Sequence, residues 1–312
     1  MKKRVLGRTG IEVSEIGLGA WQLGEESWNG PGEEESLRIV DEALALGCTF
    51  VDTAPGYGGG RSEELLGRAL AGRRDEVVLC TKFGYWPDRR PDHDAARIEE
   101  SVEQILRRLR TNTVDLLLVH SPPDPAVLDV DSPHYSVLER LKASGVIRAY
   151  GVSLTDDSGT ELRRVLETGS DAVEVRFNAL HQEPLEAIEQ AAERGVAVIV
   201  KVPLESGSLS GKYRAESTFG DVRSRWTPDE IVRRARLVDE FERLLPSGTS
   251  TPHAALQFVL AQPVVSTVIP GAKSLEQLRD NVAATEDSLP PETITAIREL
   301  WEEELQSEPL PW

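Results

Sequence analysis

Lysine is scarce in this chain, and basic residues as a whole are outnumbered. The 312 residues include 35 basic side chains against 53 acidic ones, which gives a formal net charge of −18. A surface with this balance repels a nucleic-acid backbone or an anionic membrane, so we expect neither as a partner. The seven lysines are Lys2, Lys3, Lys82, Lys142, Lys201, Lys212 and Lys273. Because they are so few, the position of each is informative.

Cysteines and long apolar runs are also lacking. The two cysteines, Cys48 and Cys80, each lie in an apolar stretch, which favours small core residues over a disulfide framework or a metal site. No run approaches the roughly 18 apolar residues of a membrane span. The opening MKKRVLGRTGIEV has a turn where a signal peptide would need about 7–15 apolar residues. We therefore expect a cytoplasmic protein.

Short apolar, β-branched segments alternate with stretches of helical spacing. The strand-like segments are SEIGLGA, TFVD, EVVLCTK, TVDLLLVH, VIRAYGVS, DAVEVRF, GVAVIVKV and VVSTVIP, and helical patterns lie at 33–46, 62–70, 94–110, 135–144, 161–168 and 184–194. Eight apolar strands, each followed by a helix, are typical of parallel strands that are buried on both faces. The sequence predicts an α/β fold, a (β/α)8 TIM barrel that spans residues 1–312 as one domain.

Two regions depart from the simple repeat. Residues 1–13 favour a β-hairpin around Thr9 and Gly10. About sixty residues separate the seventh strand from the eighth, and they contain helical patterns at 231–245 and 253–261. Such long connections often carry extra helices or functional loops. We expect extra helices there, and a last helix at 291–305 near the C-terminus.

Three predicted strands end in ionisable side chains, which are Asp52, Lys82 and His120. In a barrel the carboxyl ends of the strands share one rim, so we expect these groups to converge. Tyr57 follows Asp52 by five residues, in a glycine-rich loop that can fold back over the rim. Taken singly, each has a structural alternative, such as a turn aspartate or a loop tyrosine. Their convergence favours catalysis.

The chemistry of these four residues is coherent. A phenol with a pKa near 10 exchanges protons poorly at neutral pH, but an adjacent ammonium stabilises the phenolate and lowers that pKa. We therefore expect Lys82 to tune Tyr57, Asp52 to hold Lys82, and His120 to orient a substrate oxygen. These four residues could therefore provide general acid–base catalysis for the interconversion of a carbonyl and an alcohol. They lack a hydride source, so a cofactor is implied.

The motifs resemble those of the aldo-keto reductase superfamily over nearly the whole chain. They are VDTAPGYGGG with SEELLG, VVLCTKFG, VDLLLVHSP, GVS, the RFN of AVEVRFN, VPLESGSLSGKY and VIPGAKSLEQLRDN. The resemblance implies a barrel that binds NADP(H) in extended form at its C-terminal face, with NAD(H) as the alternative. It places the catalytic tetrad on Asp52, Tyr57, Lys82 and His120. It also implies reversible NADPH-dependent reduction of an aldehyde or ketone, with Tyr57 as the proton donor.

The resemblance also implies a set of cofactor-binding residues. They are Gly19, Ala20 and Trp21 at the end of the first strand, Ser153 and Asn178 at the nicotinamide, Leu204, Gly207, Leu209 and Gly211 around the pyrophosphate, and Lys273, Ser274, Gln277 and Asn281 at the adenine end. Lys273 at a helix start is suited to a 2′-phosphate. Ser274 and Gln277 have an alternative interpretation as a helix capping box.

Three positions depart from the commonest pattern of the family, and all three surround the nicotinamide. Leu154 stands where many members have Asn, Glu174 where many have Gln, and Lys201 with Val202 where many have a stacking aromatic. Our hypothesis is that Glu174 and Lys201 pair across neighbouring strands and jointly replace the missing contacts to the ring. The alternative is a salt bridge that fills the mouth of the barrel.

Aromatic residues after the strands are candidates for substrate contacts. Trp21 and Trp86 are the best placed, and Tyr85, Trp226 and Trp312 fall in other predicted loops of the rim. Apolar and aromatic walls suit a small carbonyl substrate. The protein is expected to be a monomer or a small homo-oligomer.

Two other functions are weighed against the enzyme. One is a cofactor-sensing regulatory subunit, because the superfamily also resembles the β subunits of potassium channels; the intact tetrad favours turnover. The other is a metal-dependent barrel hydrolase or isomerase, which needs clustered ligands. The remaining histidines, His93, His134, His181 and His253, do not fall at the ends of predicted strands, so we rank it last.

Overall fold

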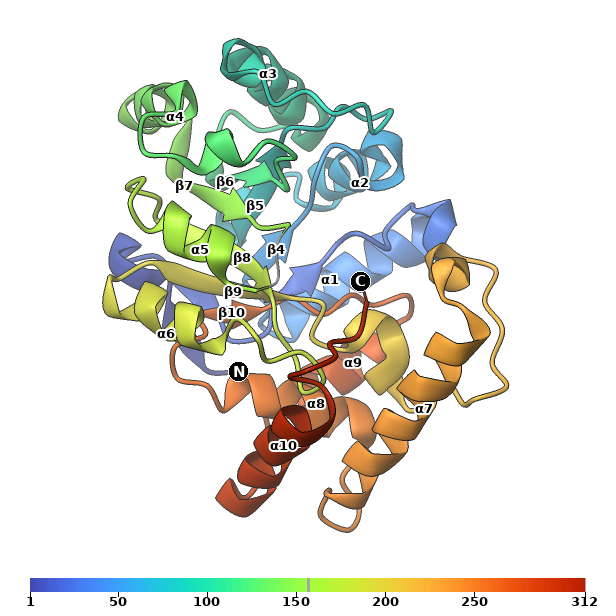
Figure 1. Ribbon diagram of the computed structural model, residues 1–312. Coiled ribbons are helices and arrows are strands. Elements are labelled where there is room, and N and C mark those ends of the chain that lie inside the picture. Colours follow the sequence, from blue (N-terminus) through green and yellow to red (C-terminus); the bar gives the residue numbers. More distant parts are fainter. Residues whose placement is uncertain (156–157, 312) are drawn as a thin grey trace.

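Eight parallel strands close into a barrel at the centre of the molecule (Figure 1). The computed structural model describes residues 1–155 and 158–311. Strands pair in chain order from β3 to β10, and bridges Ile16–Val268 and Gly19–Gly271 join the two ends, which confirms the predicted barrel. The strands are β3 (Leu18–Gly19), β4 (Phe50–Asp52), β5 (Val78–Phe83), β6 (Val114–His120), β7 (Ile147–Ser153), β8 (Ala172–Arg176), β9 (Ala197–Lys201) and β10 (Thr267–Val268).

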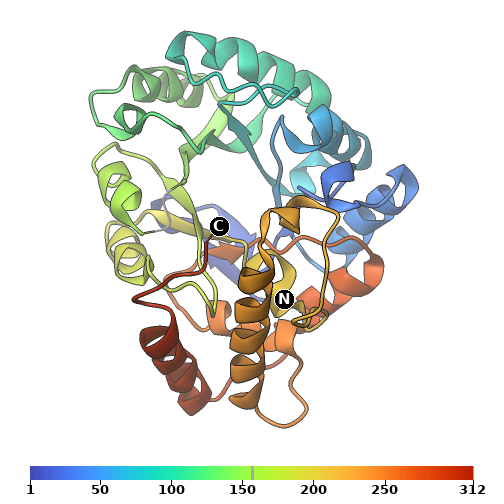
Figure 2. The ribbon, with the colours of Figure 1, turned by 45° about the vertical axis from the view of Figure 1, so that its right-hand side comes forward.

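Helices surround the strands, as Figure 2 shows. They are α1 (Glu33–Ala45), α2 (Arg61–Ala69), α3 (Ile98–Leu109), α4 (Pro133–Ala143), α5 (Thr160–Val165), α6 (Leu185–Glu193), α7 (Pro228–Arg243), α8 (Thr251–Leu260), α9 (Leu275–Ala283) and α10 (Pro291–Glu304). The long connection before β10 carries α7 and α8, as predicted. It also carries two 3-10 segments, η7 (Glu205–Ser210) and η8 (Val222–Arg225). The segment after α10 runs back towards the strands (Figures 1 and 2).

The period of two along each strand determines what lies inside the barrel. On β5, Val78 and Cys80 belong to an inner apolar cluster, and Lys82 is the next residue on that face. On β6, Leu116 and Leu118 belong to the same cluster and precede His120. Apolar side chains therefore fill the barrel towards the amino ends of these strands, while the last inward position of each strand carries a polar group. The two cysteines are buried free thiols, as predicted.

A short hairpin closes the opposite end of the barrel. Its strands are β1 (Lys3–Val5) and β2 (Glu12–Ser14), which pair in antiparallel register. Leu6, Ile11 and Val13 of this hairpin pack into the inner apolar cluster. The amide of Arg8 donates to the carbonyl of Gly195, just before β9. The hairpin therefore covers this end of the barrel.

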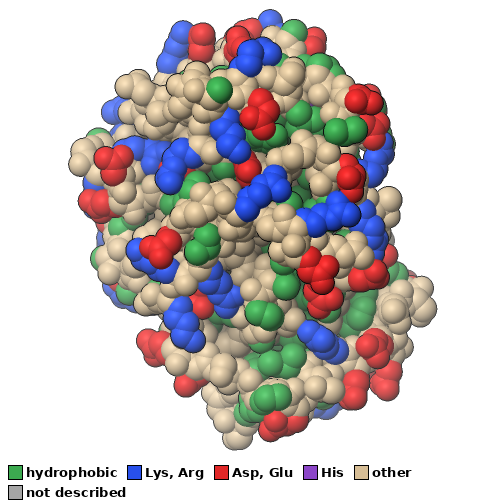
Figure 3. All heavy atoms as spheres, turned by 90° about the vertical axis from the view of Figure 1, so that its left-hand side faces the viewer, with side chains coloured by type: hydrophobic (Ala, Val, Ile, Leu, Met, Phe, Trp, Pro, Cys, Tyr) green, Lys and Arg blue, Asp and Glu red, His purple; other side chains and the backbone are tan. Residues whose placement is uncertain are grey.

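Charged side chains of both signs are interspersed over the outer surface. The face in Figure 3 shows acidic and basic groups side by side. Many of them form exposed ion pairs, such as Arg140 with Glu99 and Arg164 with Asp129. Exposed pairs of this kind contribute only about 0–1 kcal/mol each to stability. None of the described helices combines the length and the apolar composition that a membrane crossing requires.

Candidate active site

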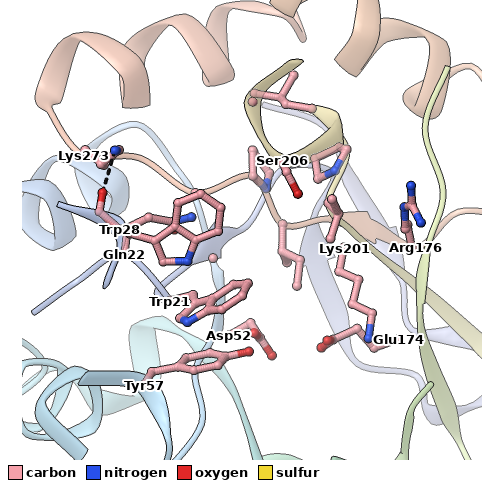
Figure 4. Close-up of a pocket in the computed structure, with 18 of the residues that line it drawn as sticks. Trp21, Gln22, Trp28, Asp52, Tyr57, Glu174, Arg176, Lys201, Ser206 and Lys273 are labelled. Atoms are coloured by element: carbon pink, nitrogen blue, oxygen red, sulfur yellow. Dashed lines mark hydrogen bonds between the residues drawn. The ribbon is translucent and has the colours of Figure 1, made fainter. Parts of the chain in front are cut away.

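A cavity of about 820 Å³ opens at the carboxyl ends of the strands. Twelve of the residues predicted from the sequence line it: Gly19, Trp21, Asp52, Tyr57, His120, Glu174, Lys201, Leu204, Gly207, Lys273, Gln277 and Asn281. Figure 4 shows Trp21, Asp52 and Tyr57 close together at one side of this cavity, and Glu174 with Lys201 across from them. The polar rim expected from the strand ends is therefore the wall of one pocket.

Lys82 is the centre of the polar network beneath this wall. Its side chain is fully buried, and its Nζ lies 2.6 Å from both carboxylate oxygens of Asp52. The same ammonium donates to the carbonyl of Thr53 at 3.1 Å and lies 3.3 Å from the hydroxyl of Tyr57. A fourth neighbour is Glu174, whose Oε2 lies at 3.4 Å. One buried cation thus contacts two carboxylates and the phenol.

These contacts determine the charge of each group. Burial alone would lower the pKa of Lys82, but the two carboxylates outweigh it and hold that pKa well above its usual value. Burial and the neighbouring Glu174 raise the pKa of Asp52 to about 7, although Lys82 opposes them. Burial also favours neutral Glu174, yet Lys82 and Lys201 keep its pKa below the ordinary value. Lys82 is therefore an ammonium at neutral pH.

The position of Lys82 also bears on metal binding. Ligand atoms of Asp52, Cys80 and Glu174 all lie within 4.8 Å of one another, a spacing that a metal ion could bridge. The ammonium of Lys82 already supplies the positive charge between the two carboxylates. Burial raises the pKa of the Cys80 thiol well above its usual value, whereas metal ligation needs the thiolate. The cluster is suited to an ammonium.

Tyr57 differs from the expectation in one respect. Lys82 lowers the pKa of this phenol, as the sequence predicts, but burial acts more strongly and Asp52 and Glu174 add to it. The net effect is a pKa above the ordinary value of 10. Tyr57 is therefore a protonated phenol whose neighbouring ammonium is placed to stabilise the phenolate once the proton has left.

His120 is a neutral imidazole beside Tyr57. Burial, together with Lys82 and Lys201, holds its pKa well below the usual value. Its Nδ1 is buried and has no hydrogen-bond partner among the described residues. An unpaired lone pair costs less there than an unpaired N–H, so we assign the proton to Nε2. The ring lies edge-on to that of Tyr57, with 6.0 Å between centroids, and forms part of the cavity wall.

The loop that carries Tyr57 is held on both sides of the tyrosine. Gly58 has a φ of 58°, a left-handed conformation that suits glycine. The amide of Gly58 donates to Glu25 at 2.9 Å, and Arg89 donates to the carbonyl of Gly56 at 3.3 Å. Glu25 and Arg89 also form an ion pair with each other. This pair fastens the backbone on either side of Tyr57.

Unpartnered hydroxyls line the part of the cavity beside η7. Ser206 Oγ and Ser210 Oγ are buried, and neither has a hydrogen-bond partner among the residues described. Gly207 between them has a φ of 94°, and a Cβ there would come within 3.1 Å of the Arg223 guanidinium. Free hydroxyl donors beside a glycine turn are suited to phosphate oxygens.

Positive charge gathers at one end of the cavity. Lys273, Arg223 and Lys212 all line it. The ammonium of Lys273 donates to the carbonyl of Trp28 at 2.7 Å, as the dashed line in Figure 4 marks. Burial, Arg223 and Lys212 lower the pKa of Lys273, whereas Asp221 raises it. This cluster is a second place where an anion is favoured.

Seven of the predicted site residues do not line the cavity, and some of them have structural partners. They are Ala20, Lys82, Ser153, Asn178, Leu209, Gly211 and Ser274. Ser274 is the N-cap of α9, where its Oγ accepts from the amide of Gln277. Gln277 turns its own Oε1 to the amide of Lys273, so half of the alternative capping box is present.

Asn178 and Trp86 have structural partners, and their roles at the cofactor and the substrate stay predictions. The side-chain amide of Asn178 donates to Val202 at 3.0 Å and to Glu205 at 2.7 Å, and its oxygen accepts from Leu180. It therefore fastens a loop, and one lone pair of its oxygen is left for a further contact. Trp86 donates to Asp92 at 2.8 Å and is absent from the cavity wall.

The other aromatic residues take several positions. Tyr85, which directly precedes Trp86, does line the cavity. Trp226 is buried under the guanidinium of Arg234. Trp312 lies outside the described residues.

Glu174 and Lys201 are connected through an intermediary, and their joint role at the nicotinamide ring stays a prediction. Lys201 Nζ donates to Ser153 Oγ at 3.0 Å, and Ser153 Oγ donates to Glu174 Oε1 at 2.8 Å. Strand register explains this, because Glu174 pairs with Ser153 on β7 and with Ile199 on β9, whereas Lys201 is aligned with Arg176. Ser153 therefore bridges the two charged groups.

The residues of the site region that escaped the sequence prediction include Glu205, Ser206, Ser210 and Arg223. The serines and Arg223 lie in the connection between β9 and β10, where no periodicity predicts which side chains face the cavity. Glu205 reads as an exposed loop acid, yet its side chain is fully buried. The one usable signal was the number of small residues in SGSLSG, which indicated a close turn but not its unpaired hydroxyls.

Glu205 anchors the loop that presents those serines. It accepts from Arg176 at 2.7 Å, from Arg234 at 2.8 Å and from Asn178 at 2.7 Å. Burial alone would raise the pKa of Glu205, but the two guanidiniums lower it to about 2. The backbone of Glu205 has a φ of 47°, a strained value for a residue other than glycine. The ion cluster holds this conformation in place.

Comparison with known proteins identifies the family. The model of the aldo/keto reductase family matches residues 15–302. The aldo-keto reductase AKR11C1 of Bacillus halodurans, in its holo form, is 33% identical, covers 96% of each chain and has a TM-score of 0.79. The glycerol dehydrogenase AKR11B4 of Gluconobacter oxydans is 29% identical, covers 97% of this chain and 96% of its own, and has a TM-score of 0.82. The NADH-specific methylglyoxal reductase of Escherichia coli is 30% identical over 97% of this chain and 99% of its own.

The chain therefore belongs to the aldo/keto reductase family, and it is an oxidoreductase. The resemblance noted from its motifs is confirmed.

We predict that Glu205→Gln destabilises the protein by about 3–5 kcal/mol at pH 7, because it leaves two buried guanidiniums without their carboxylate. The folded-state pKa of Glu205 is depressed from 4.5 to about 2, so its contribution to stability is complete above pH 4.5 and is lost as the pH falls towards 2. The difference in the free energy of unfolding between wild type and variant should therefore become smaller as the pH falls from 4.5 towards 2. Urea unfolding at several pH values measures this difference.

The matched control is Glu99→Gln, which removes an exposed partner of Arg140. We expect it to change the free energy of unfolding by less than about 1 kcal/mol. Equal stability of the two variants at pH 7 would contradict the role of Glu205.

Proposed function

We propose that this protein catalyses the reversible, NADPH-dependent reduction of an aldehyde or ketone to an alcohol. The observation that carries the proposal is the hydroxyl of Tyr57, 3.3 Å from the buried ammonium of Lys82 at the wall of the cavity. A protonated phenol beside a fixed cation can give up its proton to a carbonyl oxygen as negative charge develops there. Membership of the family supports this reaction type.

Each residue of the tetrad has a distinct proposed role. When bound, the cofactor supplies the hydride for the carbonyl carbon. Tyr57 donates its proton to the carbonyl oxygen, and Lys82 stabilises the phenolate that remains. Asp52 holds Lys82 through contacts of 2.6 Å, and the Nε2–H of His120 orients the carbonyl oxygen. In the reverse direction the Tyr57 phenolate accepts the proton of the alcohol.

We infer that the cavity holds the cofactor as an extended dinucleotide. The free hydroxyls of Ser206 and Ser210 are suited to pyrophosphate oxygens. Lys273, Arg223 and Lys212 form the cation cluster that a 2′-phosphate would occupy, which supports NADP(H). NAD(H) is the alternative, and one relative is named an NADH-specific methylglyoxal reductase.

We infer a small carbonyl compound as substrate. Trp21 and Tyr85 provide aromatic wall near Tyr57 and His120. Methylglyoxal and glycerol, which appear in the names of two relatives, are both three-carbon compounds and suggest the size to try first.

We also infer that residues 1–312 act as one domain in a reducing compartment such as the cytoplasm. The N-terminal hairpin and the barrel share one apolar cluster, which supports a single unit. Cys48 and Cys80 are buried thiols without a disulfide, which supports the compartment.

Tyr57→Phe tests the proposed proton donor. We predict that it lowers kcat for methylglyoxal reduction at least about a hundredfold, because the general acid is lost. The dissociation constant of NADPH should stay within about threefold, since no cofactor contact is assigned to the hydroxyl. Tyr85→Phe removes a hydroxyl from the same cavity away from Lys82 and serves as the control. Turnover close to wild type in Tyr57→Phe would refute the assignment.

Lys273→Gln tests the choice of cofactor. We predict that it raises the dissociation constant of NADPH about tenfold or more, because a charge-assisted contact to the 2′-phosphate is lost. The constant for NADH should change little. Lys142→Gln, on the outer helix α4, is the matched control. An equal loss for both cofactors would show that Lys273 does not recognise the 2′-phosphate. Titration of cofactor fluorescence measures both constants.

A further inference from the structure

A continuous chain of polar contacts connects Tyr57 with Lys201 across the barrel. From Tyr57 it passes at 3.3 Å to Lys82 and at 3.4 Å from Lys82 to Glu174. Ser153 then links Glu174 at 2.8 Å to Lys201 at 3.0 Å. Figure 4 shows Glu174 and Lys201 together on the wall that faces Tyr57 and Asp52. Lys201 is therefore connected to the phenol through Ser153, Glu174 and Lys82.

Above about pH 7, where Asp52 is ionised, the charges along this chain balance. Asp52 and Glu174 then carry the negative charges, and Lys82 and Lys201 carry the positive ones. Asp52, Lys82 and Glu174 are all buried, and Lys201 is half-buried. Lys82 and Asp52 already balance each other, so Glu174 alone would leave one buried negative charge. A buried, uncompensated charge is costly, and Lys201 supplies the compensation.

Lys201 is fixed where this compensation requires it. Besides Ser153, its ammonium donates to the backbone carbonyl of Leu154 at 2.7 Å. Its charge helps to keep Glu174 ionised against the effect of burial. Glu174 in turn raises the pKa of Tyr57 and strengthens the charge of Lys82. The positive charge of Lys201 itself favours the phenolate, so its direct effect on Tyr57 is opposite to that of Glu174.

Other charged and titratable groups face this chain from each neighbouring strand. They are Asp52 on β4, Cys80 and Lys82 on β5, His120 on β6, Arg176 on β8 and Lys201 on β9. Arg176 is directed to Glu205 at 2.7 Å, and burial keeps Cys80 and His120 neutral. Glu174 and Lys201 are thus the charges left to adjust the Asp52–Lys82 pair.

We propose that Glu174 and Lys201 are paired positioning residues that set the protonation of Tyr57, Glu174 from its place beside Lys82 and Lys201 by the direct effect of its own charge. Glu174 holds the phenol in its protonated form before reaction, and Lys201 limits this effect so that the proton can still be released. This inference rests on the proposed role of Tyr57 as proton donor. It adds that Glu174 and Lys201 set the pH range over which Tyr57 donates its proton.

Titration of Tyr57 in the full-length chain tests this proposal. The tyrosine ring carbons are labelled and their ionisation is followed by NMR against pH; Tyr57→Phe assigns the signal among the five tyrosines. We predict that Glu174→Gln lowers the Tyr57 midpoint by about one pH unit or more, because a nearby negative charge is removed. Lys201→Met should raise it. The double variant should return towards wild type.

Asp280→Asn is the control for the titration, because it removes an acidic charge from the same cavity wall at the end near Asn281. It should leave the Tyr57 midpoint unchanged. If Glu174→Gln does not fold, the upward shift of the Tyr57 midpoint in Lys201→Met still tests the proposal. Lys201 is only half-buried, so we expect its replacement to be tolerated. The pH profile of kcat should shift in the same direction as the midpoint in each variant, which a purely structural role would not produce.

An unchanged midpoint, or shifts of the same sign in both single variants, would overturn this proposal. That result is separate from failure of the proposed function. If Tyr57→Phe keeps its turnover, the proton donor has been assigned wrongly whatever the titrations show. If Tyr57→Phe is inactive and the midpoints do not move, only the roles of Glu174 and Lys201 fail.

Discussion

The ion pair between Lys82 and Asp52 is the interaction on which the rest of the site depends. A fully buried ammonium is stable only with counter-charge and hydrogen bonds, and Lys82 finds both in Asp52 and the carbonyl of Thr53. Once fixed, this cation determines the state of its neighbours. It favours the phenolate of Tyr57, it adds to the effect of burial that keeps His120 neutral, and together with Lys201 it holds Glu174 ionised. The barrel makes the arrangement available, because apolar layers and the hairpin occupy its opposite end.

Much of this arrangement follows from local patterns in the sequence. The ionisable residues at the ends of the predicted strands, Lys82 and His120 among them, predict convergence at one rim, because parallel strands bring their carboxyl ends together. The glycines after Tyr57 predict a tight loop that returns to the rim. The structure agrees on each point. These features could be predicted because they depend on the period of a strand and on the order of the elements, both of which are local.

What could not be predicted depends on contacts between distant segments. Asn178 follows a strand as expected, yet Val202 and Glu205 take its amide group. Arg223 reaches the cavity from a connection without periodicity. The phenol of Tyr57 has a raised pKa because burial and two carboxylates outweigh one lysine, and the sequence alone does not weigh such opposing effects. In each case the competing partner lies many residues away in the chain.

Lys82→Met is the most direct test of the account as a whole. The variant keeps the volume of the side chain and removes its charge, so turnover with NADPH and a small aldehyde should fall by at least about a hundredfold. The NMR midpoint of Tyr57 should rise, while NADPH binding and the circular dichroism spectrum should remain close to wild type. A folded variant that binds NADPH and retains turnover within about tenfold of wild type would contradict the central role of the buried ammonium.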